Sequence, residues 1–525
     1  MDHIKLLNHF RSEENINKAF IYALNDRLRN DSYFDYFEIE YVQKYRQQII
    51  EEILEELKYP KYFRVRVAYT YYFPKNNLCY RRMIYLPFKD LVVRYAFIII
   101  LANHLDKTLS NKCFANRRAT GKQAQNFLFE DYYNASVVNF RNWQKQCAEK
   151  YNVLIRTDIS SFYDSVSHQY LIKYIENQLS IDSNTEFIQI FLKLLSPKIV
   201  SYSNKLKKVQ ILQNLQQGLT IGNNLEGFLA NLYLRDVDEA MQDADIEFGR
   251  YNDDMRIFAQ DPQLARNYLL ILQEHLLSKG LNLNASKTLI AENKEEIERL
   301  RTKWFDDPSF PNSDLEDDKS LSEKSELHKY IDRDKDLDNP SSEFNLSQEI
   351  TKDEDAKNFC QFIQHYLSLP KRKLEHIDKL KIILKYWQGS SKQASWLLVQ
   401  STYDQNISDN IKSKAVESVF DILSSSEALS YTKYRLLHHL VKFKKDQYKQ
   451  PYTILNKLET KRQEKLKKIL FNLLEQPAFD LNITALYALR ILGASSTELE
   501  IYAKKYIPQP LGEPILNAII YIQEL

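Results

Sequence analysis

Cysteine and long hydrophobic runs are both scarce in this sequence of 525 residues. The apolar run at 98–101 is too short to span a bilayer. Charges recur every few residues at the amino terminus, which excludes a secretory signal peptide. Widely spaced cysteines that form no metal-ligand pair favour a reducing compartment; they are Cys79, Cys113, Cys147 and Cys360. We therefore expect a soluble, cytoplasmic protein with no membrane partner.

An excess of charge of one sign is absent too. Lys and Arg together number 72, and Asp and Glu number 70. Composition alone therefore does not indicate a nucleic-acid-binding protein, and any basic groove must be local. Glycine occurs only nine times, yet three glycines lie between positions 218 and 227, in QGLTIGNNLEG. A structural turn needs one glycine, so this cluster indicates backbone that turns sharply or lets a ligand approach closely.

The sequence patterns divide the chain into four parts. Residues 1–60 are expected to be helical, with a stripe at Tyr41, Tyr45, Ile49, Ile53 and Leu57. Residues 61–300 mix strand and helix patterns, with strands expected over 61–73. Residues 301–355 are rich in acids and serine, as is typical of a linker or mobile insertion. Residues 356–525 predict an all-α helical-repeat (HEAT-like) domain, with a compact helical bundle as the alternative.

Carboxylates follow two buried-strand patterns. Asp253 and Asp254 lie between apolar runs, as at the tip of a tight hairpin. Adjacent carboxylates can share divalent cations, because oxygen ligands suit Mg²⁺ and its charge offsets their repulsion. An ordinary solvated turn is the alternative. Asp158 ends the strand pattern at 153–157, where a metal would offset the cost of burying an acid; capping of the next helix is the alternative.

Three motifs stand in the order and spacing of the reverse transcriptase palm. TDISSFYDSVSH, GLTIGN…LANLYL and YNDD resemble motifs A, B and C of that family. KTLSNKCFANRRA resembles its fingers segment before motif A, and LNLNASKT resembles motif D. The A-B-C combination is highly specific. The resemblance implies an α+β reverse transcriptase palm and fingers at residues 61–300, followed by the all-α helical domain.

The resemblance also implies a two-metal nucleotidyl transfer. Asp158 and Asp253 would bind two Mg²⁺ ions, with Mn²⁺ as an alternative cofactor. Asp254 would support the site, and the Ile159 carbonyl would complete one metal shell. Tyr163 falls on the family's steric gate, where a ring beneath the sugar leaves no room for a 2′-hydroxyl. The implied substrates are therefore dNTPs, and the implied product is DNA.

Other nucleotide-binding positions follow from the same resemblance. Arg82 falls on the family's triphosphate contact, although a solvated strand face fits its spacing equally well. Lys287 would lie near the leaving group. Ile221 and Gly222 fall in the nucleotide-binding turn of motif B, but Ile221 replaces the family's usual glutamine. An apolar side chain cannot make the hydrogen bonds of the amide, which favours weak use of a template.

A palm followed by helical repeats resembles the bacterial abortive-infection and defence-associated reverse transcriptases. That subgroup implies antiphage DNA synthesis primed on a protein tyrosine, in some members without a template. The DNA product would then be covalently attached, and a homo-oligomer is expected. Two alternatives stay open. One is an RNA-templated reverse transcriptase of a retroelement or one that copies a noncoding RNA. The other is a degenerate palm that acts as a protein-binding scaffold, against which the three retained acids argue.

Overall fold

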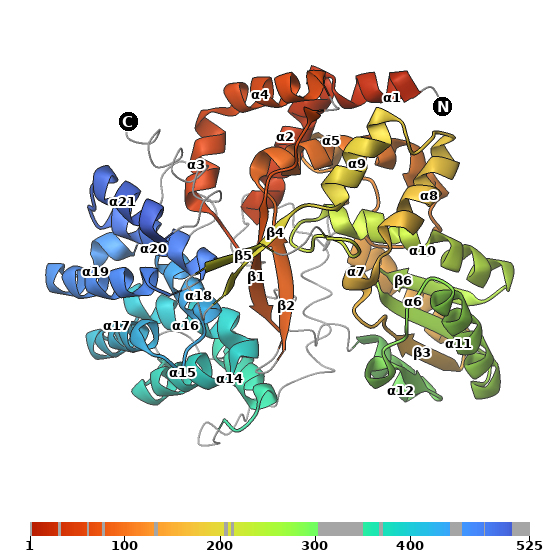
Figure 1. Ribbon diagram of the computed structural model, residues 1–525. Helices are drawn as coiled ribbons and strands as arrows, with labels where there is room; N and C mark the ends of the chain where they lie inside the picture. The colour runs from red at the N-terminus through yellow and green to blue at the C-terminus, as the bar shows by residue number, and fades with distance from the viewer. Residues whose placement is uncertain are drawn as a thin grey trace.

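The described residues form two four-stranded β-sheets with flanking helices, one near the middle of Figure 1 and the other in the part drawn on the right. We call them the palm sheet and the fingers sheet, after the parts of the fold that the sequence predicts. Most of the predicted acidic segment and the final predicted helix at 513–525 lie outside the described residues. This computed structural model describes residues 3–29, 33–59, 62–75, 79–130, 135–203, 208–211, 215–302, 350–366, 371–441, 454–476 and 478–506.

The palm sheet is antiparallel throughout, with the strand order β6-β7-β3-β8. Successive side chains of a strand point to opposite faces. Val153 and Ile155 accordingly join the main hydrophobic core, whereas Leu154 joins a smaller cluster beneath the helices α6 and α12. Both faces of the sheet are thus covered. The elements are β3 (Val153–Thr157), β6 (Glu247–Tyr251), β7 (Asp254–Ala259), β8 (Leu289–Ala291), α6 (Val137–Lys150), α10 (Leu225–Asp243), α11 (Pro262–Leu277) and α12 (Lys294–Thr302).

The fingers sheet has the strand order β2-β1-β4-β5. Strand β1 pairs antiparallel with β2 and parallel with β4. The sequence predicted strand from residue 61 onward, but β1 begins only at Ala68. The strands are β1 (Ala68–Pro74), β2 (Tyr80–Tyr85), β4 (Ile199–Ser203) and β5 (Lys208–Ile211).

Helices cover both sheets. The helix α5 lies almost wholly in the main core, against α2 and α9. The stripe expected to form one helix is divided at Tyr45, which ends α3 and begins α4. None of the described helices has both the length and the apolar character needed to cross a bilayer. Their bounds are α1 (His3–Phe10), α2 (Glu13–Arg29), α3 (Tyr36–Lys44), α4 (Arg46–Lys58), α5 (Phe88–Leu105), α7 (Phe162–Ser165), α8 (His168–Leu179) and α9 (Glu186–Leu195).

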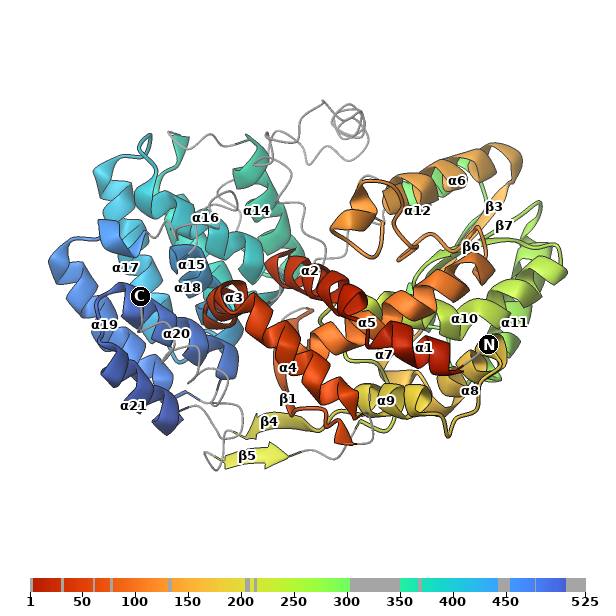
Figure 2. The same ribbon diagram turned by 90° about the horizontal axis from the view of Figure 1, so that it is seen from above.

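The carboxy-terminal part is helical wherever it is described. Alternate helices contact one another: α15 contacts α17, α16 contacts α18, and α18 contacts α20. These helices lie on the far side of the fingers sheet from the palm sheet (Figures 1 and 2). The bounds are α14 (Asp353–Tyr366), α15 (Leu374–Tyr386), α16 (Ser391–Tyr403), α17 (Asp409–Ser424), α18 (Ser430–Val441), α19 (Thr460–Leu474), α20 (Phe479–Ile491) and α21 (Ser496–Tyr506). Short 3₁₀ helices include η2 (Asp106–Thr108), η3 (Gln123–Gln125), η5 (Ala285–Lys287), η10 (Gln388–Ser390) and η11 (Leu455–Lys457).

Candidate active site

Asp158 lies directly after the central palm strand β3. Its backbone carbonyl accepts a hydrogen bond of 2.7 Å from the Asn284 N–H, and Ile159 forms an antiparallel bridge with Leu283. The next helix, α7, has Ser161 rather than Asp158 at its N-cap. The buried side chain of Asp158 is therefore not a helix cap. The backbone on both sides of it is held by the segment that follows α11.

Asp253 lies at the tip of the β6–β7 hairpin, as the sequence predicted. Tyr251 pairs with Asp254, which leaves Asn252 and Asp253 as the two turn residues. Asn252 has φ 52°, a left-handed conformation that asparagine tolerates better than most residues. Thr157, just before Asp158, pairs with Met255, so Asp158 lies beside the tip that carries Asp253. Burial, followed by the charge of Asp158, raises the pKa of the Asp253 carboxyl well above its ordinary value.

This carboxylate pair fits a divalent cation. Two acids so close together are costly to ionise, and a cation would offset their repulsion. Among the described residues, no three His, Cys, Asp or Glu side chains are grouped so as to hold a metal ion. Mg²⁺, however, is usually held by one or two carboxylates together with substrate phosphates and water. The residues that would hold it here are Asp158 and Asp253.

Asp254 has a different environment from Asp253. Its two carboxylate oxygens accept hydrogen bonds of 2.6 and 3.0 Å from the guanidinium of Arg256, which is buried. Arg156 lies 3.5 Å away, and the two arginines face each other across β3 and β7. The sequence analysis missed these arginines. Their signal was the presence of Arg in two otherwise apolar strands.

Lys287 reaches the site from the 3₁₀ helix η5. Its ammonium Nζ lies 2.6 Å from Oδ2 of Asp158, and 59% of the side chain is exposed. The structure therefore brings the predicted motif D lysine into contact with Asp158. An exposed ammonium at this position can also reach a phosphate that binds beside the carboxylates.

The glycine at the start of motif B allows the loop to pack on the backbone of motif A. The Leu219 N–H donates a hydrogen bond of 2.7 Å to the carbonyl of Tyr163. Gly218 has φ 85°, and a Cβ there would lie 3.0 Å from that same carbonyl oxygen. Burial, and next the charge of Asp253, raise the pKa of the Tyr163 hydroxyl, whereas Arg81 lowers it. The predicted gate residue thus lies within the electrostatic influence of the site.

The second half of motif B is attached to the fingers strand β2. The Ile84 N–H donates a hydrogen bond of 2.7 Å to the Ile221 carbonyl. Gly222 has φ 142°, and a Cβ there would lie 2.7 Å from the carbonyl oxygen of Ile84, so only glycine fits without a shift. The side chain of Ile221 is partly buried and packs against the second hydrophobic core. The predicted turn is present, and its isoleucine contributes to packing.

Arg82 lies on β2 and points toward motif A. Its Nη2 lies 3.2 Å from Oδ1 of Asp164, the residue after Tyr163. Its neighbour Arg81 acts on the pKa of Tyr163. The structure therefore places the predicted Arg82 beside Tyr163.

A buried charge network lies behind motif B, and the sequence analysis missed it. Arg94 lies 3.0 Å from Glu226, and both side chains are almost fully buried. Thr220 donates a hydrogen bond of 2.7 Å to Glu226 and accepts one of 2.7 Å from Arg94. Asp26 accepts hydrogen bonds of 2.7 and 3.2 Å from Asn224. Helices from the first hundred residues thus hold the motif B loop in place.

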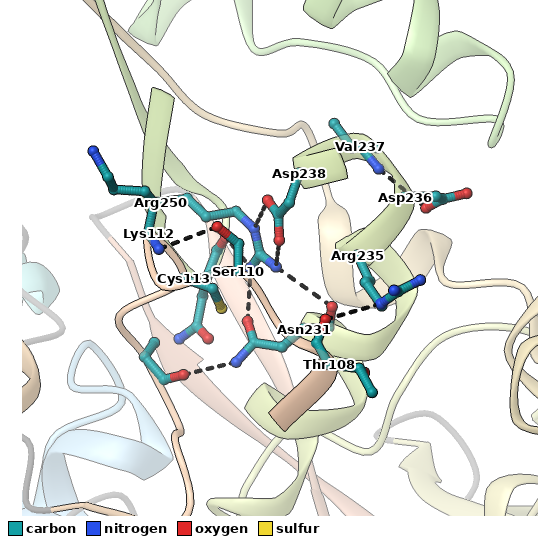
Figure 3. Close-up of polar contacts among 12 residues, drawn as sticks. Thr108, Ser110, Lys112, Cys113, Asn231, Arg235, Asp236, Val237, Asp238 and Arg250 are labelled. Carbon is teal, nitrogen blue, oxygen red and sulfur yellow. Dashed lines mark hydrogen bonds and ion pairs between the residues drawn. The ribbon is translucent and has the colours of Figure 1, made fainter. Parts of the chain in front are cut away.

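Arg250 connects the β6–β7 hairpin to the helix α10 (Figure 3). Its guanidinium makes two hydrogen bonds of 2.7 Å to Asp238 and one of 2.6 Å to the side chain of Asn231. It also donates a hydrogen bond of 3.3 Å to the carbonyl of Asn252, at the hairpin tip. The backbone of Arg250 pairs with the segment that contains Lys112 and Phe114. Through its side chain and its backbone, the buried residue Arg250 therefore connects motif B, motif C and the fingers segment.

Comparison with known proteins agrees with this geometry. Residues 86–303 match the family model described as "Reverse transcriptase (RNA-dependent DNA polymerase)". This part of the chain is therefore similar to a reverse transcriptase domain. A search of curated proteins finds no match. A solved structure titled "Partial Cas6-RT-Cas1--Cas2 complex" is 19% identical, with a TM-score of 0.28. The match covers 52% of this chain and 42% of that chain, so this chain spans less than half of it.

Proposed function

We propose that this protein is a DNA polymerase that acts in antiphage defence, with dNTPs as substrates and Mg²⁺ or Mn²⁺ as cofactor. The observation that carries the proposal is the geometry of the two acids: Asp158 ends β3 beside the β6–β7 turn that holds Asp253, and Lys287 lies 2.6 Å from Asp158. A bound divalent ion would activate the acceptor hydroxyl and stabilise the departing pyrophosphate. The two carboxylates would hold that ion, and the Ile159 carbonyl would supply a further oxygen.

The remaining residues bind and orient the nucleotide. Tyr163 packs beneath the sugar and excludes a 2′-hydroxyl. Arg82 neutralises the triphosphate, since a guanidinium group binds phosphate through paired hydrogen bonds. Lys287 exchanges its contact with Asp158 for one with the leaving group. Asp254 supports the site by holding Arg256 and Arg156, which lie behind the acids.

Substitution of either acid tests the polymerase. Asp253→Asn and Asp158→Asn are each expected to lower dNTP incorporation by roughly a thousand-fold or more, because several kcal/mol of transition-state stabilisation are lost. Asp245→Asn is the matched control, since Asp245 is an exposed acid in the turn between α10 and β6. Incorporation by either active-site variant at the control rate would contradict the proposal.

We further propose weak dependence on a template and priming on a tyrosine of the protein, with the DNA covalently attached. The apolar packing of Ile221 at the position of the template-side glutamine supports the first part. Purified protein is incubated with Mg²⁺ and labelled dNTPs, denatured and digested. Label on a tyrosine peptide supports priming by the protein. Label only in free DNA, made only with an added primer and template, or copurification of a structured noncoding RNA, favours the templated alternative.

The helical part supports the defence assignment. Contacts between alternate helices form stacked layers, and we propose that they are HEAT-like repeats. Exposure of cells to phage, with and without Asp253→Asn, tests the role in defence. Loss of protection in the variant supports it, and equal protection contradicts it. The cytoplasmic location and the homo-oligomer stay predictions, which cell fractionation and light scattering check.

A further inference from the structure

The two faces of the β1–β2 hairpin differ in what they contact. Tyr69, Tyr71 and Tyr85 point into the second core, among side chains of the helical part. Ala68 and Ile84, on the other face, join the main core on the palm side. Because side chains of a strand alternate, the rest of the palm-side face can be read directly from the register.

Toward the turn of the hairpin, this palm-side face changes from apolar to aromatic and basic. Tyr72 stands directly opposite Arg82, and Tyr80 stands opposite Pro74. Tyr80 is two residues from Arg82 on the same strand, so all three side chains share the face. Tyr72 is 50% exposed and Tyr80 is 41% exposed, whereas Tyr71, on the other face, is 3% exposed.

The position of Arg82 shows where this face points. Its guanidinium lies 3.2 Å from Asp164, next to the gate residue Tyr163. The rings of Tyr72 and Tyr80 are thus on the strand surface that borders the candidate active site. Diagonal neighbours on a sheet face are roughly 7–8 Å apart. That separation is about twice the 3.4 Å spacing of stacked bases, which leaves room for one flat ring between them.

We propose that Tyr72 and Tyr80 form a stacking site for an unpaired nucleobase, with Arg82 binding the adjoining phosphate. The proposal rests on the proposed polymerase function and names a further part of its substrate site. Aromatic rings bind bases of any sequence, because every base has a π face, and a nearby cation binds the backbone. The same chemistry fits a base of a single strand and the base of an incoming nucleotide.

Binding of a labelled oligo(dT) or oligo(U), in EDTA and without nucleotides, tests the single-strand source. Tyr72→Leu and Tyr80→Leu are each expected to weaken binding by about 5- to 150-fold. Tyr72→Phe and Tyr80→Phe keep the ring and should bind like the unchanged protein. Tyr386→Leu is the matched control, because Tyr386 is also 50% exposed but lies on α15. Thermal melting of each variant confirms that it is folded.

Salt dependence separates stacking from charge. The leucine variants should keep the slope of log affinity against log salt concentration. Arg82→Gln should reduce that slope by about 0.7, because one phosphate contact of a single strand is lost. If oligonucleotide binding does not change, a rise in the KM for dTTP in the leucine variants identifies the nucleotide as the source. Leucine variants that leave both quantities at the control values overturn the proposal, whatever other partner the tyrosines bind.

The oligonucleotide-binding experiment does not depend on catalysis. Asp253→Asn protein should bind the oligonucleotide in EDTA with the same dependence on Tyr72 and Tyr80. If that dependence is present but the unchanged protein does not polymerise dNTPs, the stacking site stands and the polymerase function fails. If the unchanged protein polymerises and the leucine variants bind oligonucleotide and dTTP normally, the polymerase stands and the stacking site fails.

Discussion

The two hairpins that border the candidate site are supported in opposite ways. The β6–β7 hairpin, which carries the acids, is held by buried charges, with Arg250 bonded to Asp238. The β1–β2 hairpin, which carries the arginines, is held by packed aromatic rings, such as Phe73 against Tyr431 of α18 at 5.2 Å. Charge-assisted hydrogen bonds are directional, whereas apolar packing is not. We therefore expect the acids to be tightly positioned, and the position of the arginines to depend on the helical part.

Among the tests of this comparison, removal of the buried guanidinium of Arg250 should have the largest effect on stability and activity. Arg250→Gln leaves Asp238 buried without its cation, which typically costs about 3–5 kcal/mol of stability. It also removes the bond to the Asn252 carbonyl, so kcat should fall more than KM changes. Calorimetry and steady-state kinetics measure the two effects.

Two further variants keep the Arg250 experiment informative. Arg250→Lys retains a charge but loses the paired geometry, and should remain folded with a reduced kcat. Arg266→Gln is the control, because Arg266 forms an exposed pair with Glu292 worth about 1 kcal/mol or less. A folded Arg250→Lys protein with the kcat of the control would show that the network does not position the acids.

The β6–β7 hairpin, which carries Asp253, should also make the stability of the protein depend on pH, whereas the aromatic packing of the β1–β2 hairpin should not. Burial and the charge of Asp158 raise the pKa of Asp253 above its unfolded value. Its contribution to stability is therefore complete below about pH 4 and is lost as pH rises through the raised pKa. Metal-free protein should lose roughly 2 kcal/mol across this window, and Mg²⁺ added above it should restore the loss.

Thermal melting in EDTA between pH 4 and pH 9 measures this effect. Other buried acids also have raised pKa values, among them Asp35, at about 7, and Asp90, at about 6. The informative quantity is therefore the difference between the unchanged protein and Asp253→Asn, with Asp245→Asn as the control. Parallel curves for all three proteins would contradict the assignment of the pH dependence to the acid pair.

Tyr163 lies between the two hairpins, under the influence of both Asp253 and Arg81. If it packs beneath the sugar, Tyr163→Val should admit ribonucleotides. The ratio of kcat/KM for dNTPs to that for rNTPs should fall by about 10- to 200-fold, the range typical of a change in pocket volume. Tyr163→Phe should keep the selectivity of the unchanged protein. A preference for ribonucleotides in the unchanged protein would contradict the DNA product.

Local patterns in the sequence predicted the β6–β7 hairpin better than the buried charged residues that hold the site in place. The hairpin at Asn252 and Asp253 was predictable because its apolar flanks and turn residues are adjacent in the chain. Arg250 lies two residues before that turn, but its partner Asp238 lies on the preceding helix α10, and helix patterns do not show which polar side chain points inward. The pair Arg94 and Glu226 joins residues 132 positions apart, and only the folded chain brings them together.

The aromatic support was unpredictable for a similar reason. Many tyrosines were visible, but composition does not tell a packed ring from an exposed one. Strand alternation separates Tyr71 from Tyr72 only when the register with β2 and the position of α18 are known. The break at Tyr45 was hidden because the apolar stripe continues across it, although α3 and α4 then pack into different cores.

The smallest expected effect comes from removing a single hydrogen bond within the aromatic packing that supports the β1–β2 hairpin. The hydroxyl of Tyr434 on α18 accepts a hydrogen bond of 2.9 Å from the Phe34 N–H, and both residues are buried. Tyr434 also packs on Tyr33, which packs on Tyr71 of β1. Tyr434→Phe removes one oxygen, leaves an N–H without its acceptor and should cost about 1 kcal/mol.

If the helical part positions Arg81 and Arg82, Tyr434→Phe should raise the KM for dNTPs by about two- to fivefold, the factor that corresponds to up to about 1 kcal/mol. The kcat should be unchanged, because the acids are held by the separate network around Arg250. Tyr386→Phe, at an exposed position of α15, is the control. A lower melting temperature with an unchanged KM would mean that the aromatic core stabilises the helical part without positioning the arginines. A fall in kcat would mean that the two hairpins are coupled, and the contrast between them would be wrong.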